Sequence, residues 1–350
     1  MFKCILPYVM LLFTFISCNT EMKYEGVKTF EWNDFQNTQE LKSRIFLNDT
    51  IVFRPKDVQV CENYLITIDY GGERGLCQIY DLRTKAKIGE RISKGNGPLE
   101  MLTPRFVKCQ SGKIAIWDAQ SSIIHKYDVK QFIESESPIP SEVIQLKKNA
   151  FVNVGFVNEG IIGQLYDKQY QLCQYDTLGK PLATFAEFPR LKSNDYNDIV
   201  KRDAYYMNFT SDEKSTIAIC YCMTDLIDLY DLDFKLKKRL HGPDYFFAHF
   251  KRIESNQIES SSPIAGKCRD AFFVPKSYND YFTVMYNGRF LSEEGHNSSS
   301  DKILSFTWEG KPLDCYHLDK KIVSYDFDEK NKKIYAIAID PEYVILEYEY

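Results

Sequence analysis

Lys113-Ile-Ala-Ile-Trp-Asp118 is followed, after a turn through Gln120-Ser-Ser122, by Ile123-Ile-His-Lys-Tyr127-Asp128. Both segments are short and rich in β-branched and aromatic residues, which predicts a pair of antiparallel strands. The same pair of segments recurs along the chain, and the second segment ends on an aromatic residue followed by an acid. This landmark stands at Tyr80-Asp81, Tyr127-Asp128, Tyr175-Asp176, Tyr230-Asp231, Trp308-Glu309 and, more loosely, Tyr348-Glu349.

The spacing of the landmark starts at about 47 residues, and a period in the forties with several strands per unit is typical of a β-propeller. Six landmarks predict an all-β, six-bladed β-propeller with four-stranded antiparallel blades. A β-sandwich or a two-domain β protein is the alternative. We expect each aromatic to pack between neighbouring sheets. The acid should open a turn by accepting backbone N–H bonds, with Gly179 and Gly310 supplying positive φ in two of these turns.

A propeller must also close its ring. The strand-like region from Ser43 to Phe53 precedes the first unit, and the chain ends on a strand at Tyr350. We therefore expect the ring to close by pairing of this N-terminal strand with the C-terminal blade, which also protects exposed strand edges.

The densest turn chemistry lies between the first two units, in the stretch from Ile88 to Phe106. Gly95, Gly97 and Pro98 fit poorly in a regular element, so this stretch is predicted to link two blades. A shorter Gly-Pro segment at His241-Gly-Pro-Asp244 suggests a later junction between blades. Helical signals are few: Asn194 to Tyr205 is predicted as a short helix and Phe246 to Ser260 as another turn or two. Ser292 to Asp301 is predicted as a polar loop.

The N-terminal sequence predicts where the protein is located in the cell. Lys3 precedes an apolar run from Cys4 to Ile16, which is too short to span a bilayer and matches a signal peptide. Phe15-Ile16-Ser17-Cys18 resembles a bacterial lipobox, although Phe15 replaces the usual Leu. This predicts a signal peptide over residues 1–17, lipidation of Cys18, a polar tether over residues 18–40 and a single β-propeller domain over residues 41–350. An ordinary secretory signal with an incidental Cys18 thiol is the alternative.

Charge and cysteine usage narrow the function. The formal net charge is −5, and no basic stretch has the character of a nucleic-acid footprint, so we expect no nucleic-acid partner. Eight cysteines remain beyond Cys18, dispersed singly through strand-like segments, at positions 61, 77, 109, 173, 220, 222, 268 and 315. Their spacing does not predict a zinc site. Buried free thiols and one or two disulfides are both compatible with it.

With these motifs in place, the chain resembles the six-bladed β-propeller lipoproteins of Bacteroidetes, of the TolB-like, BF3164-like class. Members typically carry a Gly-x-Gly-Pro-Gly-Glu segment between the first two blades, and Lys94 to Glu100 is similar to it, with Leu99 in place of the third Gly. A later Gly-Pro-Asp-Tyr segment is matched by Gly242 to Tyr245. The resemblance covers about residues 18 to 350 and implies a fold and an anchor. It transfers no catalytic residue.

No stretch predicts a catalytic centre. The Gly95-Asn-Gly-Pro segment lacks a following helix to complete a phosphate cradle and is better interpreted as a structural turn. The five histidines, at positions 125, 241, 249, 296 and 317, are isolated in sequence. No Gly-x-Ser-x-Gly elbow occurs. We therefore predict no catalytic residue, no metal and no cofactor, while noting that a propeller channel can gather ligands from several blades.

The linkers carry the candidate binding residues. Propeller ligands usually meet the mouth of the funnel, which is lined by inter-blade loops and the starts of the inner strands. Seven residues fall in or just after such linkers and form the candidate binding face: Glu100, Arg105, Asp244, Tyr245, His249, Lys251 and Arg269. Tyr and Arg combine large contact area with directed hydrogen bonds. The alternative for each residue is a structural role at a blade junction.

These observations favour a non-enzymatic lipoprotein of the bacterial cell envelope, lipid-anchored to the outer membrane on a side that the sequence leaves undecided. A propeller face would bind a protein, peptide or glycan partner. One alternative is a propeller hydrolase or lyase that acts on a sugar or lactone with a metal in the central channel. Another is a structural subunit of an envelope complex.

Overall fold

The structure is a computed structural model. It describes residues 23–350 except for positions 49, 72–74, 111, 148–149, 151–152, 159, 193–194, 213–214, 255–258 and 292–297. The signal peptide and Cys18 therefore lie outside the described residues, as does most of the loop expected between Ser292 and Asp301.

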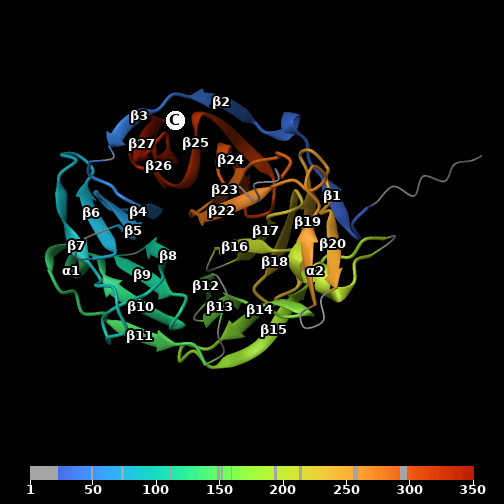
Figure 1. Ribbon diagram of the computed structural model, residues 1–350, viewed down its shortest axis with the longest axis horizontal. Coiled ribbons are helices and arrows are strands. Elements are labelled where there is room, and N and C mark those ends of the chain that lie inside the picture. The colour runs from blue at the N-terminus through green and yellow to red at the C-terminus, as the bar shows by residue number, and fades with distance from the viewer. Residues whose placement is uncertain are drawn as a thin grey trace, which may run out of the picture.

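Antiparallel sheets stand around a common centre like the blades of a propeller (Figure 1). In each blade the first strand along the chain is the innermost. Blade 1 contains β4 (Pro55–Cys61), β5 (Tyr64–Asp69), β6 (Cys77–Asp81) and β7 (Lys87–Arg91). Blade 2 contains β8 (Pro104–Gln110), β9 (Lys113–Asp118), β10 (Ile123–Asp128) and β11 (Glu142–Gln145). Blade 3 contains β12 (Val154–Val157), β13 (Gly160–Gln164), β14 (Tyr170–Tyr175) and β15 (Pro181–Glu187). Blade 4 contains β16 (Met207–Ser211), β17 (Thr216–Tyr221), β18 (Leu226–Asp231) and β19 (Leu236–His241).

Blades 5 and 6 are joined in one sheet of eight strands because they share a single long strand. Blade 5 contains β22 (Phe272–Ser277), β23 (Tyr281–Tyr286), β24 (Ser300–Thr307) and the first part of β25 (Pro312–Asp328). The second part of β25 is the innermost strand of blade 6, which continues with β26 (Lys333–Ile339) and β27 (Tyr343–Glu349). The prediction of a six-bladed all-β propeller is confirmed.

An N-terminal strand closes the ring, as predicted. β3 (Arg44–Leu47) pairs antiparallel with β27 and so becomes the outermost strand of blade 6. Phe46 and Leu47 are buried at this junction. The last blade is thus completed by the segment that leads into the first blade, and β3 and the C-terminal strand β27 are held in one sheet.

Two more N-terminal strands run along the outside of the ring (Figure 1). β1 (Val27–Thr29) adds in parallel to the edge of blade 4, and β2 (Asn37–Leu41) adds in parallel to β25 on blade 5. The 3-10 helix η1 (Trp32–Asp34) lies between them. The described part of the range where the sequence predicted a tether is therefore docked chain, because the outer edges of blades 4 and 5 offer unpaired backbone groups.

Gly242 explains how this N-terminal segment approaches blade 4. The Phe30 N–H donates to the His241 carbonyl. Gly242 has φ +151°, and a Cβ there would lie 2.1 Å from the Phe30 carbonyl oxygen. The later Gly-Pro segment of the sequence thus has a structural role, since only glycine leaves room for the passing backbone.

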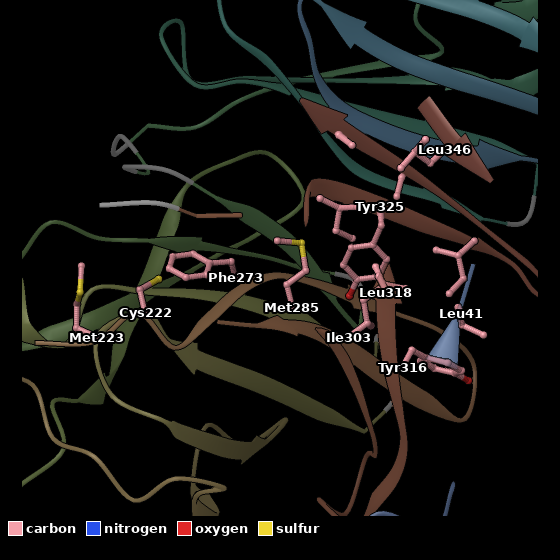
Figure 2. Close-up of a cluster of buried hydrophobic side chains, with 14 of the residues drawn as sticks. Leu41, Cys222, Met223, Phe273, Met285, Ile303, Tyr316, Leu318, Tyr325 and Leu346 are labelled. Carbon is pink, nitrogen blue, oxygen red and sulfur yellow. The ribbon is translucent and has the colours of Figure 1, made fainter. Parts of the chain in front are cut away.

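Hydrophobic clusters fill the interfaces between neighbouring blades, and each landmark aromatic packs against the preceding blade. Tyr80 of blade 1 lies with Tyr335 and Phe46 of blade 6. Tyr127, Tyr175, Tyr230, Trp308 and Tyr348 repeat this arrangement around the ring. Figure 2 shows the cluster between blades 5 and 6, where Phe273, Met285 and Ile303 meet Tyr325 and Leu346. The prediction that these aromatics pack between sheets is confirmed.

Three acids of the landmark open turns as predicted. Asp81 accepts the N–H groups of Arg83 and Thr84, and Asp176 accepts those of Leu178 and Lys180. Asp231 does the same for Asp233 and Lys235. Gly179 and Gly310 have φ values of +76° and +74°. Asp128 instead caps helix α1 (Val129–Glu134), which the sequence did not predict.

The insertions between blades confirm one helix and correct another. α2 (Asp198–Ala204) begins after its N-cap Asn197, within the predicted range of Asn194 to Tyr205. The prediction of helical turns between Phe246 and Ser260 is wrong. That region contains the first strand of a hairpin formed by β20 (Phe250–Glu254) and β21 (Glu259–Pro263). The serines and the proline of β21 are poor helix formers, and pairing with β20 satisfies its backbone.

The described cysteines include both of the states that the sequence left open, buried free thiols and a disulfide. Cys77, Cys173, Cys220, Cys222, Cys268 and Cys315 are buried free thiols. Cys61 takes part in a disulfide. Burial raises the pKa of the Cys77 and Cys222 thiols well above the usual range, which keeps them protonated and unreactive near neutral pH.

The landmark aromatics generate a stability prediction. Tyr80→Ala should lower the free energy of unfolding by about 3–5 kcal/mol, because truncation of a fully buried aromatic leaves a cavity between blades 6 and 1. Urea unfolding followed by circular dichroism measures this change. Leu178→Ala, at a side chain that is 76% exposed, is the control and should cost less than about 0.5 kcal/mol. Equal losses in the two variants would contradict the packing role.

Candidate functional site

The six innermost strands enclose a central channel of about 700 Å³. This volume lies within the range of about 300–1,000 Å³ that is usual for ligand pockets. All six blades contribute to its wall, through β4, β8, β12, β16, β22 and the second part of β25. Ring closure therefore creates the cavity, and it is the principal candidate site.

Strand register sorts the wall into two rings of side chains, because alternate residues of an innermost strand point the same way. Counting from the pairing with the second strand of each blade places one residue per blade at a common level. The ring nearer the strand starts consists of Asp57, Arg105, Asn153, Asn208, Phe273 and Ser324. The deeper ring consists of Gln59, Lys108, Gly155, Thr210, Lys276 and Asp326. All of these residues except Phe273, which packs in a buried hydrophobic cluster, line the channel.

On the wall formed by blades 5, 6 and 1, charged side chains pair with one another. Lys276 Nζ lies 3.3 Å from Asp57 Oδ1 and also donates to the Val58 carbonyl. Ser324 Oγ donates to the same Asp57 oxygen at 2.9 Å. These contacts link blades 5, 6 and 1 along the channel wall. Because Lys276 and Asp57 form an ion pair, neither presents an unpaired charge to the channel.

Asp326 is the most enclosed charged group of this wall. Its carboxylate accepts hydrogen bonds from Gln59 Nε2, the Val60 N–H and the Tyr278 hydroxyl, at 2.7–2.8 Å. Burial raises the pKa of Asp326 above its ordinary value, although Lys276 and these donors oppose the shift. The balance shows that desolvation outweighs the favourable contacts.

The wall formed by blades 2, 3 and 4 has a different charge. Arg105 and Lys108 on β8 are its charged lining residues, and the remaining polar groups are neutral, among them Asn153, Asn208 and Thr210. The three carboxylates of the lining, Asp57, Asp326 and Glu329, belong to blades 1 and 6. The channel is therefore polarised, with excess positive charge on the side of blade 2.

Of the candidate residues from the sequence, Arg105 lies in the channel and Glu100 does not. The Glu100 carboxylate folds back over the linker and accepts the Gly97 N–H at 2.8 Å. A Cβ on Gly95 would lie 2.0 Å from Glu100 Oε2. This contact explains the Gly-Asn-Gly spacing, and it gives Glu100 a structural position in the turn between blades 1 and 2.

The other five candidates lie on the linker between blades 4 and 5. Buried Asp225 accepts the N–H groups of Asp244, Tyr245 and Phe246 at 2.7–2.9 Å and so fixes this linker. The Asp244 carboxylate accepts from Trp32 Nε1 and the Tyr286 hydroxyl.

His249 directly precedes β20, and Lys251 lies on the β20–β21 hairpin. Neither lines the channel. Burial lowers the pKa of His249, with Lys267 adding to the effect. The guanidinium of Arg269 stacks 4.2 Å from the Phe290 ring centroid.

Exposed aromatics gather on one face of the propeller. Because blades are antiparallel meanders, the inter-blade linkers and the connections between second and third strands share one end of the sheets; we call this the linker face. Among the described residues, Phe53, Tyr166, Tyr245 and Phe290 are the exposed aromatics, each 37–56% accessible, and all four lie on loops of this face. Arg202 stacks on Tyr166 at 4.1 Å, as Arg269 does on Phe290.

Sequence reasoning found the linkers but missed most of the channel. Of the lining residues only Arg105 was singled out, because it follows a conspicuous Gly-Pro turn. Lys108, Asn153, Asn208, Lys276 and Asp326 carry no motif. The alternation of each first strand, read across units, was the signal that could have found them.

Two features are absent from the described residues. No group of three or more His, Cys, Asp and Glu side chains in this part of the chain is placed to hold a metal ion. No helix among the described residues is long and apolar enough to cross a membrane.

Comparison with known proteins identifies the family. Residues 34–330 match the model of a family described as TolB-like 6-blade propeller-like. The chain belongs to this family. No curated protein matches it.

Comparison with solved structures gives matches at low sequence identity. A member of the DUF4221 family from Bacteroides vulgatus has a TM-score of 0.52 and 9% identity, over 89% of this chain and 96% of that one. The Pan2 WD40 domain of Neurospora crassa has a TM-score of 0.48 and 9% identity, over 89% of this chain and 95% of that one. Raptor from Chaetomium thermophilum gives 0.47 and 10% over 85% of this chain, which spans only 27% of that structure.

The raised pKa of Asp326 generates a pH prediction. Because its folded-state pKa lies above the unfolded value of 3.8, the folded protein holds this proton more tightly. The stability due to protonated Asp326 is therefore present at low pH and is lost as the pH rises through the folded-state pKa. Asp326→Asn should remove this component, so wild type should lose stability relative to the variant as the pH rises from 3.8.

Urea unfolding of both proteins at several pH values measures the difference. Asp233→Asn, at an aspartate that is 79% exposed, is the control and should track wild type. A difference between wild type and Asp326→Asn that stays constant with pH, or that grows in favour of wild type, would show that burial does not control this carboxyl.

Proposed function

We propose that this protein is a non-enzymatic lipoprotein of the bacterial cell envelope that binds a protein, peptide or glycan partner through the linker face of its propeller. The observation that carries the proposal is the gathering of exposed aromatics on the face where the channel wall begins. Aromatic and arginine side chains dominate the energetics of binding surfaces. Two of these aromatics are already ordered by stacked guanidinium groups.

The ordering of these side chains favours recognition. Stacking on Arg202 and Arg269 limits the rotamers of Tyr166 and Phe290 before any partner arrives. Binding then costs less side-chain entropy than it would for free rings. The loops themselves are anchored, since Asp225 holds the linker that carries Tyr245 and Asp118 holds the start of β8 through Thr103.

The proposed anchor rests on the sequence. Phe15-Ile16-Ser17-Cys18 supports lipidation of Cys18, which would attach the protein to the outer membrane through its N-terminus. Several acyl chains hold a protein to a bilayer far better than one. The docking of Tyr24 against Thr224 begins six residues after Cys18, so the propeller would stay close to the membrane.

A pair of matched double variants tests the proposed face. Tyr166→Ser with Phe290→Ser removes two aromatics of the linker face. Ile139→Ser with Leu178→Ser removes two exposed apolar side chains from loops of the opposite face. The full-length, affinity-tagged protein is purified with its partners from native envelope membranes under gentle detergent conditions. Quantitative mass spectrometry compares what each variant retains.

The first double variant should retain at least about tenfold less partner, because each hot-spot aromatic is worth about 2 kcal/mol or more. The second should match wild type. Unchanged retention with the first variant, or an equal loss with the second, would contradict binding through the linker face.

A further inference from the structure

Arg105 is a solvent-exposed cation of the channel wall. It belongs to the innermost strand of blade 2 and lines the cavity. Among the described residues, no carboxylate or carbonyl pairs with its guanidinium. The nearby carboxylate of Asp118 is buried and is occupied by donors from Leu102, Thr103 and Ser121. A cation that faces a cavity without an internal partner points to an external anion.

Two phenols lie within electrostatic range of this cation. The positive charge of Arg105 acts on the phenols of Tyr70 and Tyr206, since it opposes the burial that raises the pKa of both. Tyr70 donates its hydroxyl proton to the Pro104 carbonyl, at the base of Arg105. The Tyr206 hydroxyl has no hydrogen-bond partner in the described part of the chain. Tyr70 follows β5 of blade 1, and Tyr206 directly precedes β16 of blade 4.

The neighbouring amides add further donors. Asn153 Nδ2 donates to Asn208 Oδ1 at 2.9 Å, and Asn208 Nδ2 donates to Cys222 Sγ at 3.2 Å. Each amide nitrogen uses one of its two hydrogens in these bonds. Both residues line the channel in the same ring of side chains. The bonds fix the orientation of the pair and leave a second hydrogen on each nitrogen.

The distribution of charge selects the class of ligand. The carboxylates of the lining belong to blades 1 and 6, and Asp57 is paired with Lys276. An anion beside Arg105 would thus meet a cation and neutral donors. A guanidinium fork matches the two oxygens of a carboxylate in a bidentate arrangement. One such fork with neutral donors suits a singly charged, planar anion better than a phosphate dianion.

We propose that the Arg105 side of the channel is a carboxylate-binding site, with the guanidinium of Arg105 as its charged donor and Asn153 and Asn208 as neighbouring donors. This inference rests on the proposed function and specifies the chemistry of the partner. The remainder of the ligand extends along the channel, whose volume of about 700 Å³ exceeds that of a small anion. Two sources fit, a peptide with a free C-terminus and an acidic oligosaccharide.

Isothermal titration of the full-length protein with two matched pairs of probes tests the site. One pair is N-acetyl-trialanine with a free C-terminus and its C-terminal amide. The other is trigalacturonic acid and its methyl ester. The carboxylate member of at least one pair should bind at least about tenfold more tightly than its neutral counterpart, a difference of about 1.4 kcal/mol. The pair that shows the preference identifies the source.

Variants separate charge from geometry. Arg105→Ala should reduce the affinity for the carboxylate probe to that of the neutral probe, and Arg105→Lys should retain only part of the preference because an ammonium lacks the fork. Lys235→Ala, which removes an exposed cation from blade 4, should bind like wild type. Added salt should weaken the preference.

Three results with the wild-type protein would overturn the site. The first is that neither carboxylate probe binds at concentrations up to about 10 mM, which would mean a binding free energy weaker than about −4.1 kcal/mol. The second is equal binding of the charged and neutral probes. The third is tighter binding of inorganic phosphate than of the carboxylate probe. Unchanged binding by Arg105→Ala would do the same. A negative result for the carboxylate site would not contradict binding through the linker face, since the double variants that test the linker face replace no channel residue.

Discussion

Closure of the ring at blade 6 is the interaction on which the other features depend. β25 runs without interruption from the outer edge of blade 5 to the inner edge of blade 6, and β3 completes blade 6 from the N-terminal side. Without β3, the edge of β27 would be open, and the cluster around Tyr80 would lose Phe46 and Leu47. Closure therefore satisfies backbone groups and fills a hydrophobic interface in the same step.

The channel follows from that closure. Six innermost strands face one another only when every blade is held against two neighbours, and contacts across the wall, such as Lys276 with Asp57 and Gln59 with Asp326, span blades 5, 6 and 1. These polar contacts consume the carboxylates on one side of the channel. They leave Arg105 on the other side facing neutral donors. The polarity of the cavity is thus tied to how the ring is joined.

The sequence predicted what is repeated and local. Tyr80, Tyr127 and Tyr175 mark blade interfaces because a repeated aromatic in a strand can be buried only against a neighbour, and Asp81 or Asp176 closes its turn within a few residues. The outer strands β1 and β2 were not predicted. Their short, mostly polar segments gain stability only from edges that exist after folding.

The candidate site was predicted only in part, for a similar reason. Arg105 could be found because it follows the Gly-Pro linker, whereas Lys108, Asn208 and Asp326 belong to the site only through the register of strands far apart in sequence. Counted from the Gly-Pro pair of each segment, Phe250 is the residue equivalent to Arg105. The inserted β20–β21 hairpin instead delays the start of blade 5 to Phe272.

Hydrogen exchange at the closure tests the central claim most directly. The amides of β3, Arg44–Leu47, and of β27 are compared with those of the inner strands by mass spectrometry of the full-length protein. If β3 closes the ring, its paired amides should exchange only by global unfolding, with the same free energy as the slowest core amides. Exchange of the β3 amides at the rate of exposed loops, while the inner strands stay protected, would contradict closure by this strand.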